Sequence, residues 1–201
     1  MATTQRTIAA FDFDGTLTRS DTLPQFIIHA IGRRRFLTAL IRTAPWLAAY
    51  RIGLYSNSRA KERLFSACFR GMSRRQFSEA AASFTSTLLS TLLRHDTVKA
   101  LNRHVSEGHT VYIVSASLRD WIEPWAIAHG VTGVLATEAA IDSHGRLTGR
   151  FARRNCHGHE KVNRILEAEP DRQSYRLVAY GDSSGDTPML DMADEPHLIK
   201  S

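Results

Sequence analysis

The chain has 201 residues, 43% of them hydrophobic and 23% charged, with a formal net charge of +6 and a sequence pI near 9.7. This length and composition exclude a disordered chain and predict one ordinary hydrophobic core with a small insertion. Two cysteines, Cys68 and Cys156, are too few for a disulfide scaffold, and no apolar segment of signal-peptide length precedes the first expected strand, so we expect a cytoplasmic protein.

The first expected strand is the apolar run Ile8-Ala9-Ala10-Phe11, and Asp12-Phe13-Asp14-Gly15-Thr16 follows it directly. Side chains alternate along a strand, so Asp12 and Asp14 are expected on the same side while Phe13 turns into the core. Two adjacent carboxylates repel each other and need a cation, a shared proton or both. Taken alone, the motif is equally well explained as a turn whose aspartates cap the next element.

After this motif the alternation of strands and helices stops, and it resumes with a helix expected over 97–105. The intervening residues have helical spacing, with amphipathic helices predicted over 25–31, 36–50 with a kink at Pro45, 59–69 and 73–93. This change of periodicity predicts two domains. We expect residues 1–17 and 95–201 to form the core domain and residues 18–94 to form an inserted helical cap domain.

A second expected strand, Val111–Ser115, ends in a hydroxyl side chain. A helix over 118–129, a strand over 131–136, a hairpin over 139–148, a helix that starts near Lys161 and strands over 177–180 and 197–199 follow it. The predicted fold is α/β, a doubly wound, mostly parallel open sheet of the Rossmann-like type, with an all-helical cap inserted after the first strand.

The strand over 177–180 leads into a second acidic cluster, Gly181-Asp182-Ser183-Ser184-Gly185-Asp186. In open parallel sheets the carboxyl ends of the strands converge on one crevice, so we expect Asp12, Asp14 and Asp182 to meet there. Hard oxygen ligands that leave room for several waters suit Mg²⁺. The sequence therefore predicts a magnesium site.

Carboxylate, hydroxyl, lysine and acidic loop occur here in the segments DFDGT, VSAS, GHEKV and GDSSGDTPML. In this order and context they resemble the four motifs of the haloacid dehalogenase-like (HAD-like) phosphohydrolases, specifically subfamily IB, the phosphoserine phosphatase-like branch. The resemblance spans nearly the whole chain. It implies that Asp12 is the nucleophile that forms an aspartyl-phosphate, and that Asp14 is the acid/base that protonates the leaving oxygen and then activates water.

The same resemblance implies roles for the other motif residues. Ser115, through its hydroxyl, and the adjacent Ala116 would bind the phosphoryl group. Lys161 would neutralise charge on the nucleophile and the phosphate. Asp182 would complete the Mg²⁺ shell together with Asp12 and the backbone carbonyl of Asp14, and Asp186 would support the metal through water or from behind the ligands.

The chemistry calls for these residue types independently of the family. Phosphoryl transfer spreads negative charge over the equatorial oxygens, and catalysis is mostly positioning and electrostatic stabilisation. Mg²⁺ and Lys161 would cancel the repulsion between Asp12 and the phosphate, while a covalent intermediate divides one difficult displacement into two. Asp14 must be protonated in the first half and ionised in the second, which requires a raised pKa.

Two residues bear on the substrate. Asp21 matches the position at which phosphoserine phosphatases carry a glutamate that meets the amino group of the substrate, and it equally fits the N-cap of the helix near Pro24. Arg63 is a candidate for contact with a substrate carboxylate. We expect a small phosphorylated metabolite such as phosphoserine or histidinol phosphate, with hydrolysis and phosphotransfer to a second substrate both open, and oligomeric state undetermined.

The positive charge favours anionic partners. The run Arg33-Arg34-Arg35 fits a solvated helix start, and no nucleic-acid module accompanies it, so no nucleic-acid partner is expected. Residues 36–55 are the most apolar stretch, but Arg42, Arg51 and Pro45 argue against a membrane span. An interfacial helix that makes peripheral membrane contact and a cap helix packed on its neighbours both remain open.

Bacterial phosphatidylglycerophosphatases of this branch share an apolar cap and a similar GHEKV segment, which keeps a lipid phosphate among the substrates. The alternative outside enzymology is a phosphate-binding or membrane-recruitment module that has kept the fold. The charged residues of the four motifs argue against this module, because folding alone does not demand four charged groups in one crevice. Residues 155–159, with one cysteine and two histidines, lack the four ligands of a closed zinc site.

Overall fold

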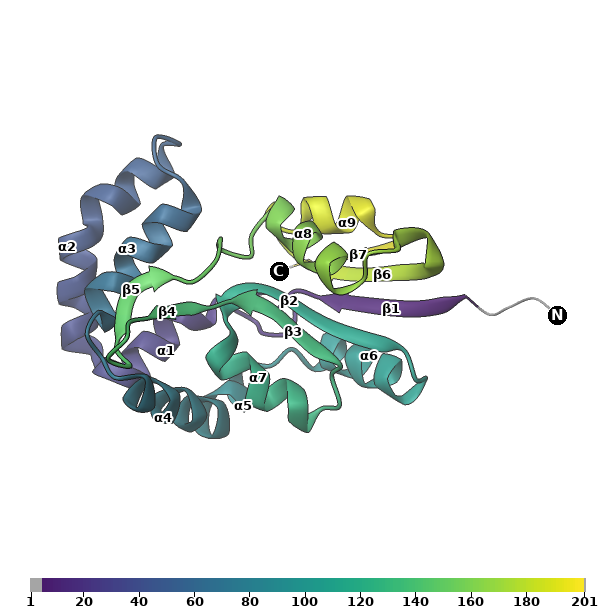
Figure 1. Ribbon diagram of the computed structural model, residues 1–201, viewed down its shortest axis with the longest axis horizontal. Helices are drawn as coiled ribbons and strands as arrows, with labels where there is room; N and C mark the ends of the chain where they lie inside the picture. Colours follow the sequence, from purple (N-terminus) through teal and green to yellow (C-terminus); the bar gives the residue numbers. More distant parts are fainter. Residues whose placement is uncertain (1–4, 201) are drawn as a thin grey trace.

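A five-stranded parallel sheet forms the centre of the core domain (Figure 1). It is seen in a computed structural model that describes residues 5–200. In spatial order the strands are β3 (Gly133–Thr137), β2 (Thr110–Leu118), β1 (Arg6–Phe11), β6 (Tyr175–Gly181) and β7 (Glu195–Leu198). The predicted α/β class with a doubly wound parallel sheet is confirmed.

Helices cover both faces of this sheet. Figure 1 shows α6 (His95–Ser106) and α7 (Arg119–Ala128) on one face, and α8 (His159–Ala168) and the short α9 (Thr187–Met192) on the other. The residues of β1 alternate accordingly, because Ala9 and Phe11 belong to the cluster under α7 whereas Ile8 and Ala10 pack with residues of α8 and α9.

The central strand β1 is the point at which the strand order reverses. It pairs with β2 on one side and with β6 on the other, both in parallel. Its four apolar residues, Ile8 to Phe11, are completely buried, which explains why the run is apolar without alternation. Ligands bind outside the carboxyl end of such a strand in open α/β sheets, and this end is where Asp12 follows.

The cap lies beside the carboxyl ends of the strands and is helical throughout (Figure 1). Its elements are α1 (Thr22–Ile31), α2 (Arg33–Arg51), α3 (Asn57–Phe69), α4 (Arg74–Phe84), the π-helical turn η1 (Thr85–Leu89) and α5 (Ser90–Leu92). Phe26 packs at ring distances of 5.3 to 5.7 Å from Phe69, Phe77 and Phe84, and stacks on Trp121 of α7 at 4.3 Å. One hydrophobic core therefore continues from the cap into the core domain.

The region expected as one helix over 73–93 is instead divided. α4 ends at Phe84 and the chain continues through the π-helical turn to α5. The Thr85 hydroxyl donates to the carbonyl of Ala81 at 2.9 Å and is also 2.8 Å from that of Trp121. Hydroxyl side chains in this Ser/Thr-rich stretch compete for backbone carbonyls, a local effect that hydrophobic periodicity does not report.

Two further features of the fold concern the hairpin and Pro45. The hairpin of β4 (Ala139–Ile141) and β5 (Leu147–Phe151), which the predicted boundaries assign to the core domain, packs on α3, with Phe151 5.5 Å from Phe65. α2 runs through Pro45 to Arg51 without ending. Pro45 is exposed, so water can satisfy the carbonyl that loses its helical donor.

Candidate active site

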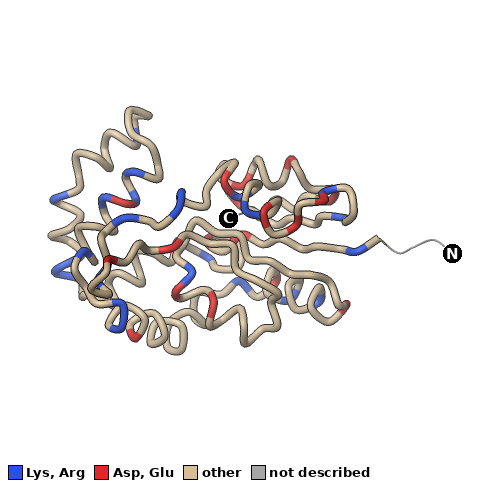
Figure 2. The backbone as a smooth tube through the Cα atoms, viewed as in Figure 1, with Lys and Arg blue, Asp and Glu red and all other residues tan. Residues whose placement is uncertain are grey.

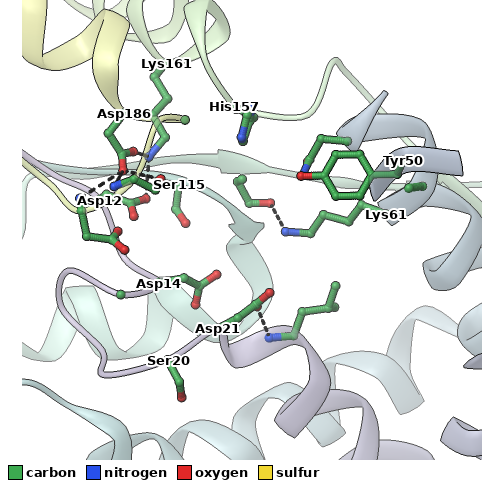
Figure 3. A pocket seen from close by; sticks show the side chains of 18 of the residues that line it. Asp12, Asp14, Ser20, Asp21, Tyr50, Lys61, Ser115, His157, Lys161 and Asp186 are labelled. Atoms are coloured by element: carbon green, nitrogen blue, oxygen red, sulfur yellow. Dashed lines mark hydrogen bonds and ion pairs between the residues drawn. The ribbon is translucent and has the colours of Figure 1, made fainter. Parts of the chain in front are cut away.

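A cavity of about 500 Å³ lies at the carboxyl ends of the strands, between the core domain and the cap (Figure 3). The loops after β1 and β6, the carboxyl end of β2 and the start of α8 line one side, and α2 and α3 line the other. The lining residues from the core include Asp12, Asp14, Ser115, Ala116, His157, Lys161, Asp182 and Asp186, and those from the cap include Leu47, Tyr50, Asn57 and Lys61.

Lys161 is the cation of this cavity that is buried most deeply, with 2% of its surface exposed. It lies in the first turn of α8, and its Nζ is 2.5 Å from Asp12 Oδ1 and 2.5 Å from Asp186 Oδ1. Burial opposes the charge on Lys161, but the two carboxylates outweigh it, so the pKa of Lys161 lies above its ordinary value. The ammonium therefore stays charged between two acidic loops that are distant in sequence.

Asp12 is held by the sheet, because its backbone N–H donates to the Tyr180 carbonyl at 2.9 Å. Burial raises the pKa of Asp12 to about 7, against the opposing effect of Lys161. Oδ1 of Asp12 accepts the lysine, which leaves Oδ2 without a bond to Lys161. A divalent cation in the cavity would favour the ionised form and so shift this carboxyl toward a nucleophile.

Asp14 has different partners from Asp12. Its Oδ1 accepts from the backbone N–H and the hydroxyl of Thr22 at 2.9 and 2.7 Å, and its Oδ2 is hydrogen-bonded to the Ser117 hydroxyl. Burial raises the pKa of Asp14, Asp21 adds to this effect, and Lys61 opposes it. A carboxyl whose bonding partners are uncharged and whose pKa is raised suits proton transfer.

The first and the last acidic loop meet at Gly15. Gly15 has a φ of +82°, and a Cβ added there would lie 2.2 Å from the carboxylate of Asp182. Asp182 in turn accepts from the Thr16 hydroxyl at 3.2 Å. Only glycine allows both the left-handed turn and this close approach. Gly15 of the DFDGT motif therefore leaves the space that the Asp182 carboxylate occupies.

The carboxylate oxygens of Asp12, Asp182 and Asp186 lie within 4.8 Å of one another. Oδ2 of Asp186 accepts from the Asp182 N–H, the Ser183 N–H and the Ser183 hydroxyl at 2.8 to 3.2 Å, and its Oδ1 accepts Lys161. Asp186 is therefore engaged through both oxygens in holding the loop and the lysine. Asp12 and Asp182 remain as hard oxygen donors beside it, a set that fits Mg²⁺ completed by water.

Ser115 and Ala116 both lie at the cavity, at the carboxyl end of β2. The Ser115 hydroxyl accepts from the backbone N–H of Ser117 at 3.0 Å, and the Ala116 carbonyl accepts from Lys61 Nζ at 3.0 Å. Sequence reasoning did not identify Ser117 or Lys61. The second serine of VSAS was a usable signal for Ser117, but nothing in the cap sequence distinguishes Lys61 from its basic neighbours.

Asp21 serves as the N-cap of α1, where it accepts from the Leu23 N–H at 2.9 Å, and it also lines the cavity. Asp21 can therefore cap the helix and face the cavity at the same time. Arg63 needs a correction, since it is exposed, stacks over Trp46 at 5.2 Å and lines a separate depression with Arg59, Arg70 and Arg150. Lys61, half a turn earlier on α3, is the basic side chain that this helix presents to the cavity.

His157 is a further cavity residue that the motifs do not predict. A Cβ at Gly185 would lie 2.5 Å from its Nε2, so glycine in the last acidic loop makes room for the ring. Burial lowers the pKa of His157, and the charge of Lys161 lowers it further. The shift favours the neutral ring, which adds a hydrogen-bonding group beside Lys161.

The model of one protein family matches residues 9–191, and its description is haloacid dehalogenase-like hydrolase. The match includes every charged residue of the cavity described above. The chain belongs to the haloacid dehalogenase-like hydrolases. The predicted family is thereby confirmed, and with it membership of a class of hydrolytic enzymes.

Among the proteins similar to this chain, the protein CicA of Caulobacter vibrioides is 34% identical over 94% of this chain and 83% of its own length. A protein of unknown function from Bordetella pertussis has the same fold, with a TM-score of 0.82, 24% identity and coverage of 96% and 89% of the two chains. A substrate-bound phosphoserine phosphatase matches with a TM-score of 0.64, 16% identity and coverage of 94% and 83%. This HAD-like hydrolase thus has the fold of the phosphoserine phosphatase-like branch.

Proposed function

We propose that the protein is a Mg²⁺-dependent phosphomonoester hydrolase that works through an aspartyl-phosphate at Asp12. The observation that carries the proposal is the contrast between two carboxyls of one loop. Asp12 is bonded to a buried ammonium, whereas Asp14 is bonded to hydroxyls and an amide. One is thereby arranged as an anionic nucleophile and the other as a proton donor.

In the first half-reaction, Oδ2 of Asp12 attacks phosphorus while Oδ1 stays on Lys161, and Asp14 gives its proton to the leaving oxygen. In the second, Asp14, now ionised, takes a proton from the water that attacks the aspartyl-phosphate, and Asp12 is released. Asp12 and Asp182 would hold Mg²⁺, whose positive charge would offset the repulsion between carboxylate and phosphate.

The remaining residues position the phosphoryl group and the loops. Lys161 offsets negative charge on the equatorial oxygens, and Asp186 keeps the lysine in place. The Ser115 hydroxyl and Lys61 face the same cavity and supply further donors to the phosphate. Lys61 comes from the cap, so closure of the cap over the substrate completes the binding site and excludes water.

The cavity volume of about 500 Å³ supports a small phosphorylated metabolite as substrate. The polar residues Arg19, Asp21 and Asn57 at its wall would bind a charged or hydroxylated leaving group of the phosphoserine or histidinol phosphate kind. A lipid phosphate is the second candidate, favoured by the apolar residues Leu47 and Tyr50 on the cap side of the cavity. We propose a cytoplasmic location, which two free cysteines support.

The test is phosphate release from phosphoserine, histidinol phosphate, sugar phosphates, nucleotides and phosphatidylglycerophosphate at matched Mg²⁺. We expect turnover of at least one small substrate, its loss on chelation of the metal, and a loss of at least about 10⁴-fold in Asp12→Asn. Asp191→Asn, an exposed aspartate of α9, is the matched control and should retain full activity.

Product analysis separates hydrolysis from phosphotransfer, because a phosphotransferase would give a phosphorylated acceptor in place of free phosphate. Turnover that persists in Asp12→Asn would contradict the proposal. So would the absence of turnover across the whole panel with metal bound, since the four motifs would then serve binding alone.

A further inference from the structure

The outward face of α2 carries large apolar side chains that no part of the described chain covers. Leu37 and Ile41 are 57% and 75% exposed, and Ala44, Ala48 and Ile52 continue the same face at spacings of three or four residues. The opposite side of the helix is the packed one, with Ala39 and Thr43 buried. Figure 1 shows α2 on the side of the cap away from the sheet, so this stripe faces solvent.

The stripe continues into the tip of the cap. α2 ends at Arg51, and the turn that follows exposes 71% of Ile52 and 78% of Leu54. No helix among the described residues is long and apolar enough to cross a membrane. An exposed apolar strip along one side of a helix, joined to an apolar turn, matches a segment that lies in an interface.

The formal charges of this segment are all positive. Residues 22–61 contain six arginines and one lysine and no aspartate or glutamate. Figure 2 shows basic positions and no acidic ones along the outer helix of the cap. Arg33 and Arg34 lie at its start, Arg42 lies in its middle and Arg51 lies at its end, all exposed. These arginines border the apolar stripe at both ends and along its side.

These observations distinguish between the possible binding partners of this face. A second copy of the chain in a twofold dimer would bring the same arginines against one another with no acidic residue to compensate. An anionic bilayer satisfies both properties at once, because its acyl region takes up the apolar side chains and its headgroups take up the arginines. We infer that α2 and the turn after it, residues 33–54, form a docking surface for an anionic lipid bilayer.

The geometry gives this docking a consequence for the cavity. Leu47 and Tyr50 line the cavity from the other side of the same helix, and the Tyr50 hydroxyl accepts from Asn57 of α3 at 3.0 Å. A docked α2 therefore has one side in the lipid interface and the other on the cavity. This would place the site next to the membrane surface without inserting the core domain.

The experiment uses the full chain and sedimentation with vesicles of two compositions, phosphatidylcholine alone and phosphatidylcholine mixed equally with phosphatidylglycerol. We expect partition onto the mixed vesicles and little onto the neutral ones, with a decrease as salt rises. Ile41→Asp should lower the partition coefficient at least about tenfold, and Arg42→Gln about fivefold.

Matched controls separate docking from general surface effects. Ile127 on α7 is 71% exposed, close to the 75% of Ile41, and Ile127→Asp makes the same change in charge on the core domain. Arg103→Gln on α6 likewise matches Arg42→Gln. Both controls should bind vesicles like the unmodified protein, and all four variants should hydrolyse a small soluble phosphate ester at the unmodified rate.

Equal binding to neutral and anionic vesicles, no binding to either, or equal losses in Ile41→Asp and Ile127→Asp would overturn the inference. A dimer in sedimentation equilibrium that Ile41→Asp dissociates would also overturn it, because a second copy would then cover the face. Absence of hydrolysis with vesicle binding intact would instead count against the proposed function alone, so the two failures are distinguishable.

Discussion

The crevice and the outer face of the cap differ in where their charged side chains lie and in which partners they have. In the crevice, Lys161 is buried and bonded to Asp12 and Asp186, so that each charge has a fixed partner. Along the outer face of the cap, Arg42 and Arg51 are exposed and lie beside exposed apolar side chains. A buried charge requires its partner for folding, whereas an exposed one is free for a partner outside the chain.

Because of this difference, the two regions should respond differently to substitution. Under the proposed function, substitutions in the crevice should change protonation, catalysis and stability together, because the same carboxylates would serve all three. Substitutions on the outer face of α2 should leave folding and catalysis unchanged and alter only association. The comparison would fail if both regions responded alike.

After the loss expected in Asp12→Asn, the largest effect is expected in the crevice at Asp14. Asp14→Asn removes the proposed proton donor and should lower kcat about 10³-fold with alkyl phosphate esters. With p-nitrophenyl phosphate, whose leaving oxygen needs little protonation, the loss should be much smaller in the first half-reaction. Single-turnover measurements on both substrates test this expectation. An equal loss on both would contradict the assignment of Asp14 as the acid.

The next largest effect concerns stability at Lys161. Lys161→Met leaves Asp12 and Asp186 buried beside each other without their cation, and should lower the free energy of unfolding by about 3 to 5 kcal/mol without metal. Added Mg²⁺ should restore part of the loss. Arg153→Met, which removes the exposed partner of Glu167, is the control and should give no measurable change. Urea unfolding with and without Mg²⁺ measures the free energy of unfolding of both variants. Equal losses in the two variants would contradict the expected difference between a buried and an exposed ion pair.

The buried and the exposed face of the cap should also differ in how much each contributes to stability. Phe26→Ala removes a ring at the centre of the cap core and should destabilise the protein by about 3 to 5 kcal/mol. Leu37→Ala on the outer face should change the free energy of unfolding by no more than about 0.5 kcal/mol. Thermal and urea unfolding provide the measurement. A large destabilisation in Leu37→Ala would show that the outer face packs against part of the chain.

A smaller effect than that of Phe26→Ala is expected from His104, a buried base that lacks carboxylate partners in bonding contact. The ring nitrogens of His104 lie 2.8 Å from His109 and 3.1 Å from the Tyr180 hydroxyl, and burial, followed by the His109 and Arg103 charges, lowers the pKa of His104 to about 4. The unfolded state binds more protons between this value and the ordinary pKa of 6.5, so stability falls as pH falls through that window.

At pH 5 this protonation should cost about 2 kcal/mol relative to neutral pH, a loss that His104→Gln lacks. Urea unfolding of both proteins at neutral pH and at about pH 5 measures the difference. Parallel changes in the two proteins would show that His104 is not the titrating group. Glu107, which lies 3.5 Å from His109, raises the pKa of His104 and so opposes part of the shift.

The sequence predicts the parts of this structure that follow from local pattern. The apolar run before Asp12 and the one before Asp182 become neighbouring buried strands, because a continuous run of that length fits a parallel strand covered on both faces. The topology rule for parallel sheets then places their carboxyl ends together. The convergence of the acidic loops therefore follows from sequence before any coordinates are known.

Other features depend on tertiary contacts and have no local signal. Lys61 and Arg63 are both basic residues of α3, yet only the packing of α3 against the core decides that Lys61 faces the cavity. The division of the expected helix over 73–93 arises where the Thr85 hydroxyl lies close to a carbonyl of α7. α9 has only six residues, too short for hydrophobic periodicity to report.

The covalent step at Asp12 is tested most directly by quenching the protein in acid during turnover, reducing it with borohydride and locating the modified side chain by mass spectrometry. We expect modification at position 12 in the unmodified protein and none in Asp12→Asn, because an acyl phosphate is reduced whereas a free carboxyl is not. Modification at another carboxylate, or none while phosphate is being released, would contradict an aspartyl-phosphate at Asp12.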